Sequence, residues 1–170
     1  MPGPLRAVFD CMTFLQATGN PTGPAAACLR LLDTGAIALF VSDDILREVE
    51  NVLSRPKLRQ KNPRLTDQSV RKLLDHLAIK ATRIESVPAN FNFPRDPKDE
   101  PYINLAIVSG ANYLVTRDND LLDLMVDNPG GIGFRARFPA LTILDPVAFL
   151  ADVAKAHAAA PQPPESAPDT

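Results

Sequence analysis

The fold class can be read most directly from one run, Asn112-Tyr113-Leu114-Val115-Thr116-Arg117-Asp118, in which an apolar, strand-like segment ends just before an acid. The chain opens in the same way, because Leu5-Arg6-Ala7-Val8-Phe9 leads directly into Asp10. Side chains at the C-terminal ends of parallel strands face the crevice in which open α/β sheets bind ligands. We therefore expect Asp10 and Asp118 to face one shared crevice.

Strand-like segments alternate with helical patterns on both sides of this run. Such alternation predicts an α/β fold with a parallel sheet that helices cover on both faces. Strands are expected over residues 5–9, 37–41, 81–87, 112–116 and 141–144. Helices are expected after the N-caps Ser42, Thr66 and Asp145, from Pro24, from Asp99 to about Ser109, and over about 119–126.

Two segments between these elements are expected to lack regular structure. The residues from Pro88 to Pro97 show neither helical nor strand periodicity. Gly130-Gly131-Ile132-Gly133 suggests a phosphate-binding loop, but no Gly-Lys-Ser/Thr follows it. We interpret this glycine-rich stretch as a turn or flexible connector.

The domain organisation follows from length and from a change in composition near the C-terminus. A chain of 170 residues suits one domain with a packed core. We expect that domain to span residues 1–157. From residue 158 the sequence becomes rich in alanine and proline, a composition that cannot pack. Residues 158–170 are therefore expected to be a disordered tail.

The overall composition indicates an ordinary globular protein. Hydrophobic residues make up 45% and charged residues 22%, and the formal net charge is −2, so nucleic-acid binding would need a local basic patch. The two cysteines show no metal-ligand spacing and are too few for a disulfide scaffold, which favours a reducing compartment. Neither a long apolar run nor a signal peptide is evident, so we predict a cytoplasmic protein with no membrane partner.

Four acids stand out against this background: Asp10, Glu48, Asp99 and Asp118. If they gather in one crevice, each pair at about 4 Å costs roughly 4 kcal/mol at an effective dielectric near 20. Protons or a divalent cation would relieve that repulsion. Taken singly, Asp99 and Asp118 could be helix caps and Glu48 a solvated helix residue. Asp10 follows a buried strand and must find a partner.

Three blocks of sequence line up in one order: Val8–Ala17, Ser42–Lys57 and Arg95–Leu122. Together they resemble the PIN-domain family, in particular its branch of toxin components of toxin–antitoxin pairs. The resemblance covers about residues 5–150. It implies a three-layer α/β/α PIN-like fold with a parallel central sheet, and a metal-dependent ribonuclease that hydrolyses single-stranded RNA. It also implies an antitoxin protein as partner and the possibility of a homodimer.

The resemblance also implies roles for individual residues. The family's four acids fall on Asp10, Glu48, Asp99 and Asp118. A supporting hydroxyl falls on Thr116, and a frequent additional acid falls on Asp120. The family's usual Asp-Thr-Asn motif reads Asp10-Cys11-Met12 here, so an amide that normally helps to order the site is missing.

The chemistry of phosphodiester hydrolysis leads to the same acids. The reaction needs an activated water and charge stabilisation, which one or two Mg²⁺ or Mn²⁺ ions supply. Such hard cations prefer oxygen ligands. We assign Asp10 the bridging position and Asp99 and Asp118 further ligand positions. Glu48 is expected to orient or deprotonate the attacking water. The acids expected to tune the site from outside the ligand set are Asp96 and Asp120.

A basic segment follows the second block. From Arg55 to Lys72 there are seven basic residues against one acid, Asp67. This segment could contact the RNA backbone, and the residues we expect to do so are Arg55, Lys57, Arg59 and Lys61. It could also be a solvated loop between two helices, or the contact surface for an acidic partner protein.

Two other functions remain open at this point. Asp10-Cys11-Met12-Thr13 superficially resembles the Asp-x-Asp-x-Thr motif of haloacid-dehalogenase-like phosphatases, although Met12 replaces the second acid. A PIN-like fold with a weakened first motif could instead act only as a binding module for RNA or an antitoxin.

Overall fold

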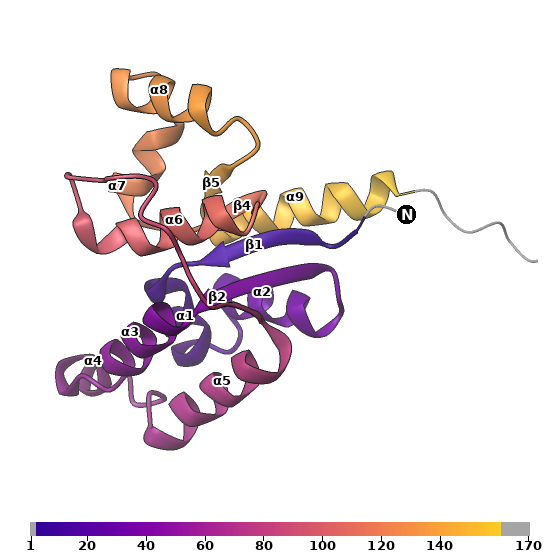
Figure 1. Ribbon diagram of the computed structural model, residues 1–170. Coiled ribbons are helices and arrows are strands. Elements are labelled where there is room, and N and C mark those ends of the chain that lie inside the picture. Colours follow the sequence, from indigo (N-terminus) through magenta and orange to yellow (C-terminus); the bar gives the residue numbers. More distant parts are fainter. Residues whose placement is uncertain (1–2, 161–170) are drawn as a thin grey trace, which may run out of the picture.

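Five parallel strands form one sheet in the computed structural model, which describes residues 3–160 (Figure 1). The predicted α/β class and the parallel sheet are confirmed. The sheet order is β3-β2-β1-β4-β5. The strands are β1 (Leu5–Phe9), β2 (Ile37–Ser42), β3 (Thr82–Ile84), β4 (Tyr113–Val115) and β5 (Thr142–Leu144).

The central strand β1 fixes the geometry of the crevice. It pairs with β2 on one side and with β4 on the other. Phe9 is in register with Val115, and the backbone N–H of Asp10 donates to the carbonyl of Val115 at 3.1 Å. The chain therefore leaves β1 and β4 side by side at the same edge. Ligands bind at such a switch in strand order in open α/β sheets.

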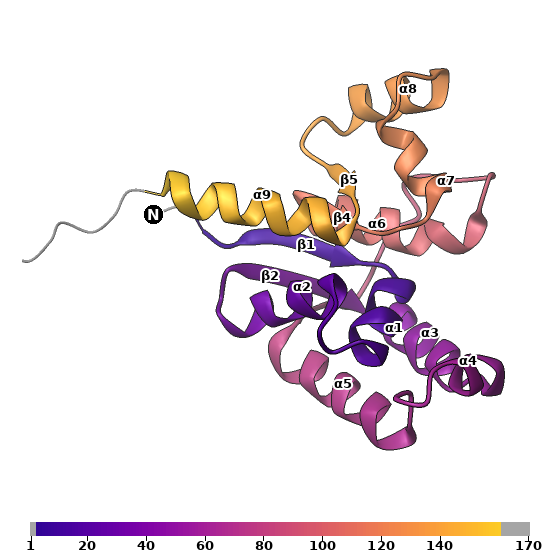
Figure 2. The same cartoon turned by 180° about the vertical axis from the view of Figure 1, so that it is seen from behind.

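Helices cover the sheet on both faces. Helix α6 packs on β1, β2 and β4, whereas α2 and α9 pack together on the opposite face (Figure 1 and, from behind, Figure 2). The helices and 3₁₀ turns are α1 (Cys11–Gly19), α2 (Pro24–Asp33), α3 (Asp43–Leu53), α4 (Pro56–Lys61), α5 (Asp67–Lys80), η1 (Pro97–Asp99), α6 (Glu100–Val108), α7 (Asn119–Leu122), η2 (Asp123–Met125), α8 (Pro129–Arg137) and α9 (Pro146–Ala159).

The N-caps predicted from sequence are confirmed. Ser42 accepts from the backbone N–H of Ile45, and Thr66 forms a capping box with Ser69. Asp145 accepts from the backbone N–H of Ala148. Each cap satisfies one of the N–H groups that a helix start leaves without an internal partner. These polar residues therefore set where α3, α5 and α9 begin.

Three helices lie where none was expected. The connector interpretation of the glycine-rich stretch is wrong, because it forms α8, capped by Asn128. A Cβ on Gly131 would lie 2.2 Å from the carbonyl oxygen of Val126, so glycine permits this close approach. The interpretation of the basic segment after Arg55 as a solvated loop is likewise wrong where α4 forms. Helix α1 was not predicted from the sequence.

The C-terminal helix α9 continues through Ala159, into the first positions of the predicted tail. The tail residues from 161 onward lie outside the described residues. Within residues 3–160, none of the helices combines the length and the apolar character that crossing a bilayer requires.

Candidate active site

A cavity of about 360 Å³ opens beside the C-terminal ends of β1 and β4. All four acids singled out from the sequence line it, and Asp96 joins them. The structure also brings two cations and several other side chains to its wall. The lining residues are Asp10, Cys11, Met12, Glu48, Val52, Arg55, Asp96, Lys98, Asp99, Tyr102 and Asp118.

Asp10 lies at the floor of this cavity, with 4% of its surface exposed. It follows the last residue of β1 and caps α1. Its Oδ1 accepts from the backbone N–H and the hydroxyl of Thr13, at 2.8 and 2.6 Å, and its Oδ2 accepts from the Thr116 hydroxyl. Burial raises the pKa of Asp10, and the threonine bonds oppose that shift.

Thr116 connects two of the acids. Its hydroxyl donates to Asp10 and accepts from the backbone N–H of Asp118 at 2.9 Å. Thr116 itself is fully buried. These two hydrogen bonds fix the position of Asp10 relative to Asp118 at the ends of β1 and β4.

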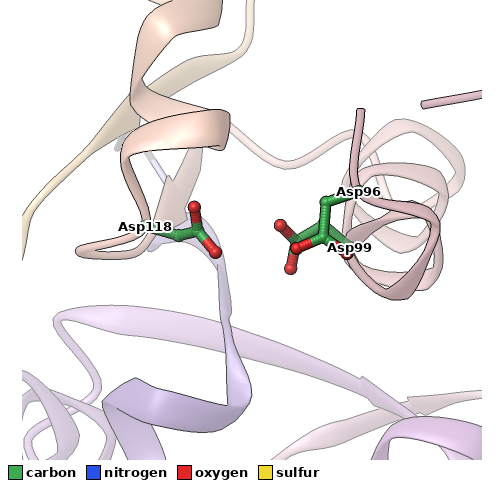
Figure 3. A group of neighbouring side chains, drawn as sticks. All are labelled: Asp96, Asp99 and Asp118. Atoms are coloured by element: carbon green, nitrogen blue, oxygen red, sulfur yellow. The ribbon is translucent and has the colours of Figure 1, made fainter. Parts of the chain in front are cut away.

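Asp118, Asp99 and Asp96 bring one carboxylate oxygen each to within 4.8 Å of one another. Asp118 comes from the start of α7, while Asp96 and Asp99 come from the segment that opens α6, and they face one another across a gap (Figure 3). Their mutual repulsion is not offset by a salt bridge among the described residues.

The repulsion among these carboxylates affects the pKa of Asp99. Burial and then the charges of Asp118, Asp96 and Asp10 raise the pKa of Asp99 to about 7. Its Oδ2 is buried and has no hydrogen-bond partner among the described residues. A buried acceptor without a partner costs free energy, which a bound cation would recover. The donor set of several carboxylate oxygens suits a hard divalent cation.

Glu48 reaches the cavity from α3. Its Oε2 accepts a hydrogen bond from the hydroxyl of Tyr102 on α6, at 2.8 Å. Tyr102 is buried in the cavity wall, with 2% of its surface exposed. Sequence reasoning did not select Tyr102, although its place one turn after Asp99 in a helix would put both on one face.

Asp120 does not join the acid group. Its Oδ1 pairs with Arg95 at 2.6 Å, and the same guanidinium pairs with Asp123 at 2.8 Å. These two ion pairs fasten the segment before α6 to α7 and η2. Asp96, by contrast, lines the cavity and caps η1 by accepting from the backbone N–H of Lys98.

The irregular segment that carries Asp96 is held by polar contacts from α6. The side chain of Asn104 both accepts from the N–H and donates to the carbonyl of Phe91, at 2.8 and 3.1 Å. Glu100 accepts from the N–H of Phe93 at 2.8 Å. These bonds replace the backbone pairing that a strand would supply, so the segment has a defined path without secondary structure.

The basic residues expected to bind RNA occupy different environments. Arg55 lines the cavity at the N-terminus of α4. Lys57 and Lys61 lie exposed on that helix. Arg59 turns back to the carbonyl of Leu53 and to Asp67, at 3.0 and 2.6 Å. Lys98, a cavity cation that sequence reasoning did not select, belongs to the segment that carries Asp96 and Asp99.

Cys11 and Met12 replace the polar residues of the expected motif. Met12 is 45% exposed and lines the cavity. The Cys11 thiol is buried, and burial together with the nearby charges of Glu48 and Asp10 raises its pKa to about 12. A thiol in this state is a poor nucleophile.

Comparison with known proteins agrees with this geometry. The family model of the PIN domain matches residues 6–120 of the chain. The chain is 31% identical over 124 residues to the uncharacterized protein MJ1680 of Methanocaldococcus jannaschii. That alignment covers 73% of this chain and 77% of the archaeal protein.

Proposed function

Because the chain belongs to the PIN domain family, we propose that it is a metal-dependent endoribonuclease acting on single-stranded RNA. PIN domains are generally nucleases that bind divalent metals. The observation that carries the proposal is the approach of Asp96, Asp99 and Asp118 to within 4.8 Å, with one buried oxygen of Asp99 left without a partner. Several carboxylate oxygens at this spacing suit a hard divalent cation, which would relieve their repulsion.

The residues proposed to hold the cation are Asp10, Asp99 and Asp118, with Asp96 as an additional carboxylate in reach. When bound, Mg²⁺ or Mn²⁺ would supply an acidified water and charge stabilisation at the phosphate. Thr13 and Thr116 fix both oxygens of Asp10, so that Asp10 presents its charge without a change of rotamer. Such preorganisation lowers the cost of assembling the site.

The other cavity residues have proposed roles toward RNA. Glu48 would orient or deprotonate the attacking water. Arg55 and Lys98 would contact phosphates at the cavity, and the exposed Lys57 and Lys61 would continue this contact along α4. The bonds of Arg59 to α3 and Asp67 support a role in holding α4 in place.

As a finer part of the proposal, the chain is a cytoplasmic toxin of a toxin–antitoxin pair, with an antitoxin protein or a second copy of itself as possible partners. This part rests on the resemblance of its motifs to the toxin branch of the family. A second candidate, an RNA- or antitoxin-binding module without turnover, is favoured by one observation. Met12 occupies an exposed cavity position where the family usually has an amide.

The test is an RNA cleavage assay with chelation and metal restoration. We expect cleavage of a single-stranded RNA oligonucleotide to stop with chelator and to return with Mg²⁺ or Mn²⁺. Asp118→Asn should lower the rate by at least about 100-fold, because it removes a charge from the ligand group. Asparagine caps a helix as well as aspartate does, so the start of α7 should survive.

Asp145→Asn is the matched control, since it makes the same change at the N-cap of α9. It should cleave RNA like the unaltered chain. Cleavage that persists after thorough chelation would rule out the proposed reaction class. Metal-dependent RNA binding without any turnover would favour the binding module instead.

A further inference from the structure

We propose that Tyr102 is a positioning residue that holds Glu48 in its reactive orientation, an inference that rests on the proposed nuclease function. The role proposed for Tyr102 does not include binding the metal. Its hydroxyl donates to Oε2 of Glu48 at 2.8 Å across the cavity wall. The bond joins α3 to α6, and its two residues are 54 positions apart in the chain.

Glu48 depends on this bond for its orientation. A glutamate side chain loses rotamer freedom when it is fixed, so a fixed orientation needs a contact that holds it. Among the described residues, the Tyr102 hydroxyl is the one hydrogen-bond partner of its carboxylate. The bond occupies Oε2 and leaves Oε1 to act on a water in the cavity.

Tyr102 is well suited to hold a carboxylate. Its ring is 2% exposed and packs within the hydrophobic core, so the hydroxyl cannot swing away. Burial, together with the nearby Cys11 and Glu48, raises the pKa of Tyr102, so the phenol keeps its proton and donates it. Both residues line the cavity that contains Asp10, Asp99 and Asp118.

Tyr102→Phe isolates this role, because it removes the hydroxyl and keeps the buried ring. We expect kcat on a single-stranded RNA oligonucleotide with Mn²⁺ to fall by about 10- to 100-fold, since loss of fixed geometry costs that much. KM for RNA should stay within about twofold, because Glu48 is proposed to act on water rather than to bind RNA.

The matched control is Tyr113→Phe, the same change at the only other tyrosine of the chain. Tyr113 lies on β4 beside Phe149 and Asp152, away from the cavity lining. Tyr113→Phe should leave kcat unchanged. A second test combines Tyr102→Phe with Glu48→Ala, where the hydroxyl has no carboxylate to hold. The double variant should then be no slower than Glu48→Ala alone.

The outcomes separate the two ideas. If the unaltered chain does not cut RNA with Mg²⁺ or Mn²⁺, the proposed function fails and the role of Tyr102 fails with it. If the unaltered chain cuts RNA and Tyr102→Phe is equally fast, only the positioning role is overturned. A loss confined to KM, a further loss in the Glu48→Ala background, or a collapse of the melting temperature would also overturn it.

Discussion

Asp10 is a carboxylate in the protein core, and the two threonines beside it explain how the fold tolerates it. A buried charge costs several kcal/mol unless hydrogen bonds or a counter-ion compensate it. Thr13 and Thr116 give three bonds to its two oxygens. Even so, burial raises the pKa of Asp10, so protonation competes with ionisation, and the proposed cation would favour the ionised form.

We predict that Asp10→Asn abolishes RNA cleavage, with a loss of at least about 100-fold, while the protein still folds. The Oδ1 bonds from Thr13 can persist, and the amide nitrogen can donate to the Thr116 hydroxyl. We expect the free energy of unfolding to change by no more than about 1–3 kcal/mol. Cleavage rates measure the loss of activity, and denaturant titration measures the change in the free energy of unfolding. Retained activity would show that Asp10 is not a catalytic residue.

Asp99 predicts how stability depends on pH in the absence of metal. Its folded-state pKa of about 7 lies above the ordinary 3.8, so the folded state binds the proton more tightly. Protonated Asp99 therefore contributes to the free energy of unfolding. This contribution is fully present below about pH 4 and is lost as pH rises through about 7. Asp99→Asn, which is neutral throughout, should be more stable than the unaltered chain above pH 7. After discounting for partial exposure, the gain is about 1–2 kcal/mol.

Denaturant titrations in chelator between pH 4 and 8 measure this gain. It should be small at pH 4 and should level off above pH 7. A gain that is independent of pH would mean that Asp99 is not protonated in the folded state. Asp145→Asn is again the control, because it makes the same chemical change at a helix cap outside the acid group, and asparagine retains the cap.

Met12 marks the departure from the expected motif, and it can be reversed. We predict that Met12→Asn raises the cleavage rate, because an amide at this cavity position can order a carboxylate or a water. Met12 is 45% exposed, so stability should change by less than about 0.5 kcal/mol. Kinetics under saturating metal measure the effect. An unchanged rate would mean that the position is dispensable in this chain.

At the scale of elements, the capped and strongly periodic segments were predictable, and the short elements were not. Ser42 and Thr66 mark helix starts that sequence reasoning found, because a polar cap precedes a clear apolar period. Helix α8 was missed because its three glycines point to a loop. Its start depends on the Asn128 cap and on the close approach of Gly131 to the carbonyl of Val126, two local contacts that the glycine content obscured.

Helix α4 carries the prediction for RNA binding at this scale. Replacing Lys57 and Lys61 together by glutamine should weaken RNA binding and reduce its dependence on salt by nearly two counter-ions. Both side chains are exposed, so the fold should not change. Binding measured from low to high salt gives both quantities.

The control replaces Lys80 and Lys155, two exposed lysines on α5 and α9, by glutamine. The net charge of the two double variants is identical, so a general effect of charge would appear in both. Equal losses of RNA affinity would show that α4 is not the path of the RNA.

At the scale of the whole molecule, the strand order of the sheet brings acids that are far apart in the sequence into one group. Asp10 and Asp118 each follow a strand, and the pairing of β1 with β4 places those strands side by side. This much follows from the sequence, because acids after parallel strands share an edge. The bond of Tyr102 to Glu48 does not follow, since it depends on how α6 packs against α3. The places of Lys98 and Arg95 do not follow either, since they depend on how the segment before α6 packs.

These acids converge only in the folded state, so the proposed cation site exists in the folded chain and not in the unfolded one. Divalent metal should therefore raise the melting temperature. At a metal concentration about 100 times the dissociation constant, the stabilisation is about 2.7 kcal/mol, which for this length corresponds to a rise of about 5–10 °C. Asp118→Asn should lose most of the rise, and Asp145→Asn should keep it. Thermal unfolding with Mg²⁺, with Mn²⁺ and with chelator measures these shifts without any RNA. If metal leaves the melting temperature of the unaltered chain unchanged at millimolar concentration, the acids meet without forming a cation site, and their repulsion must be relieved by protons alone.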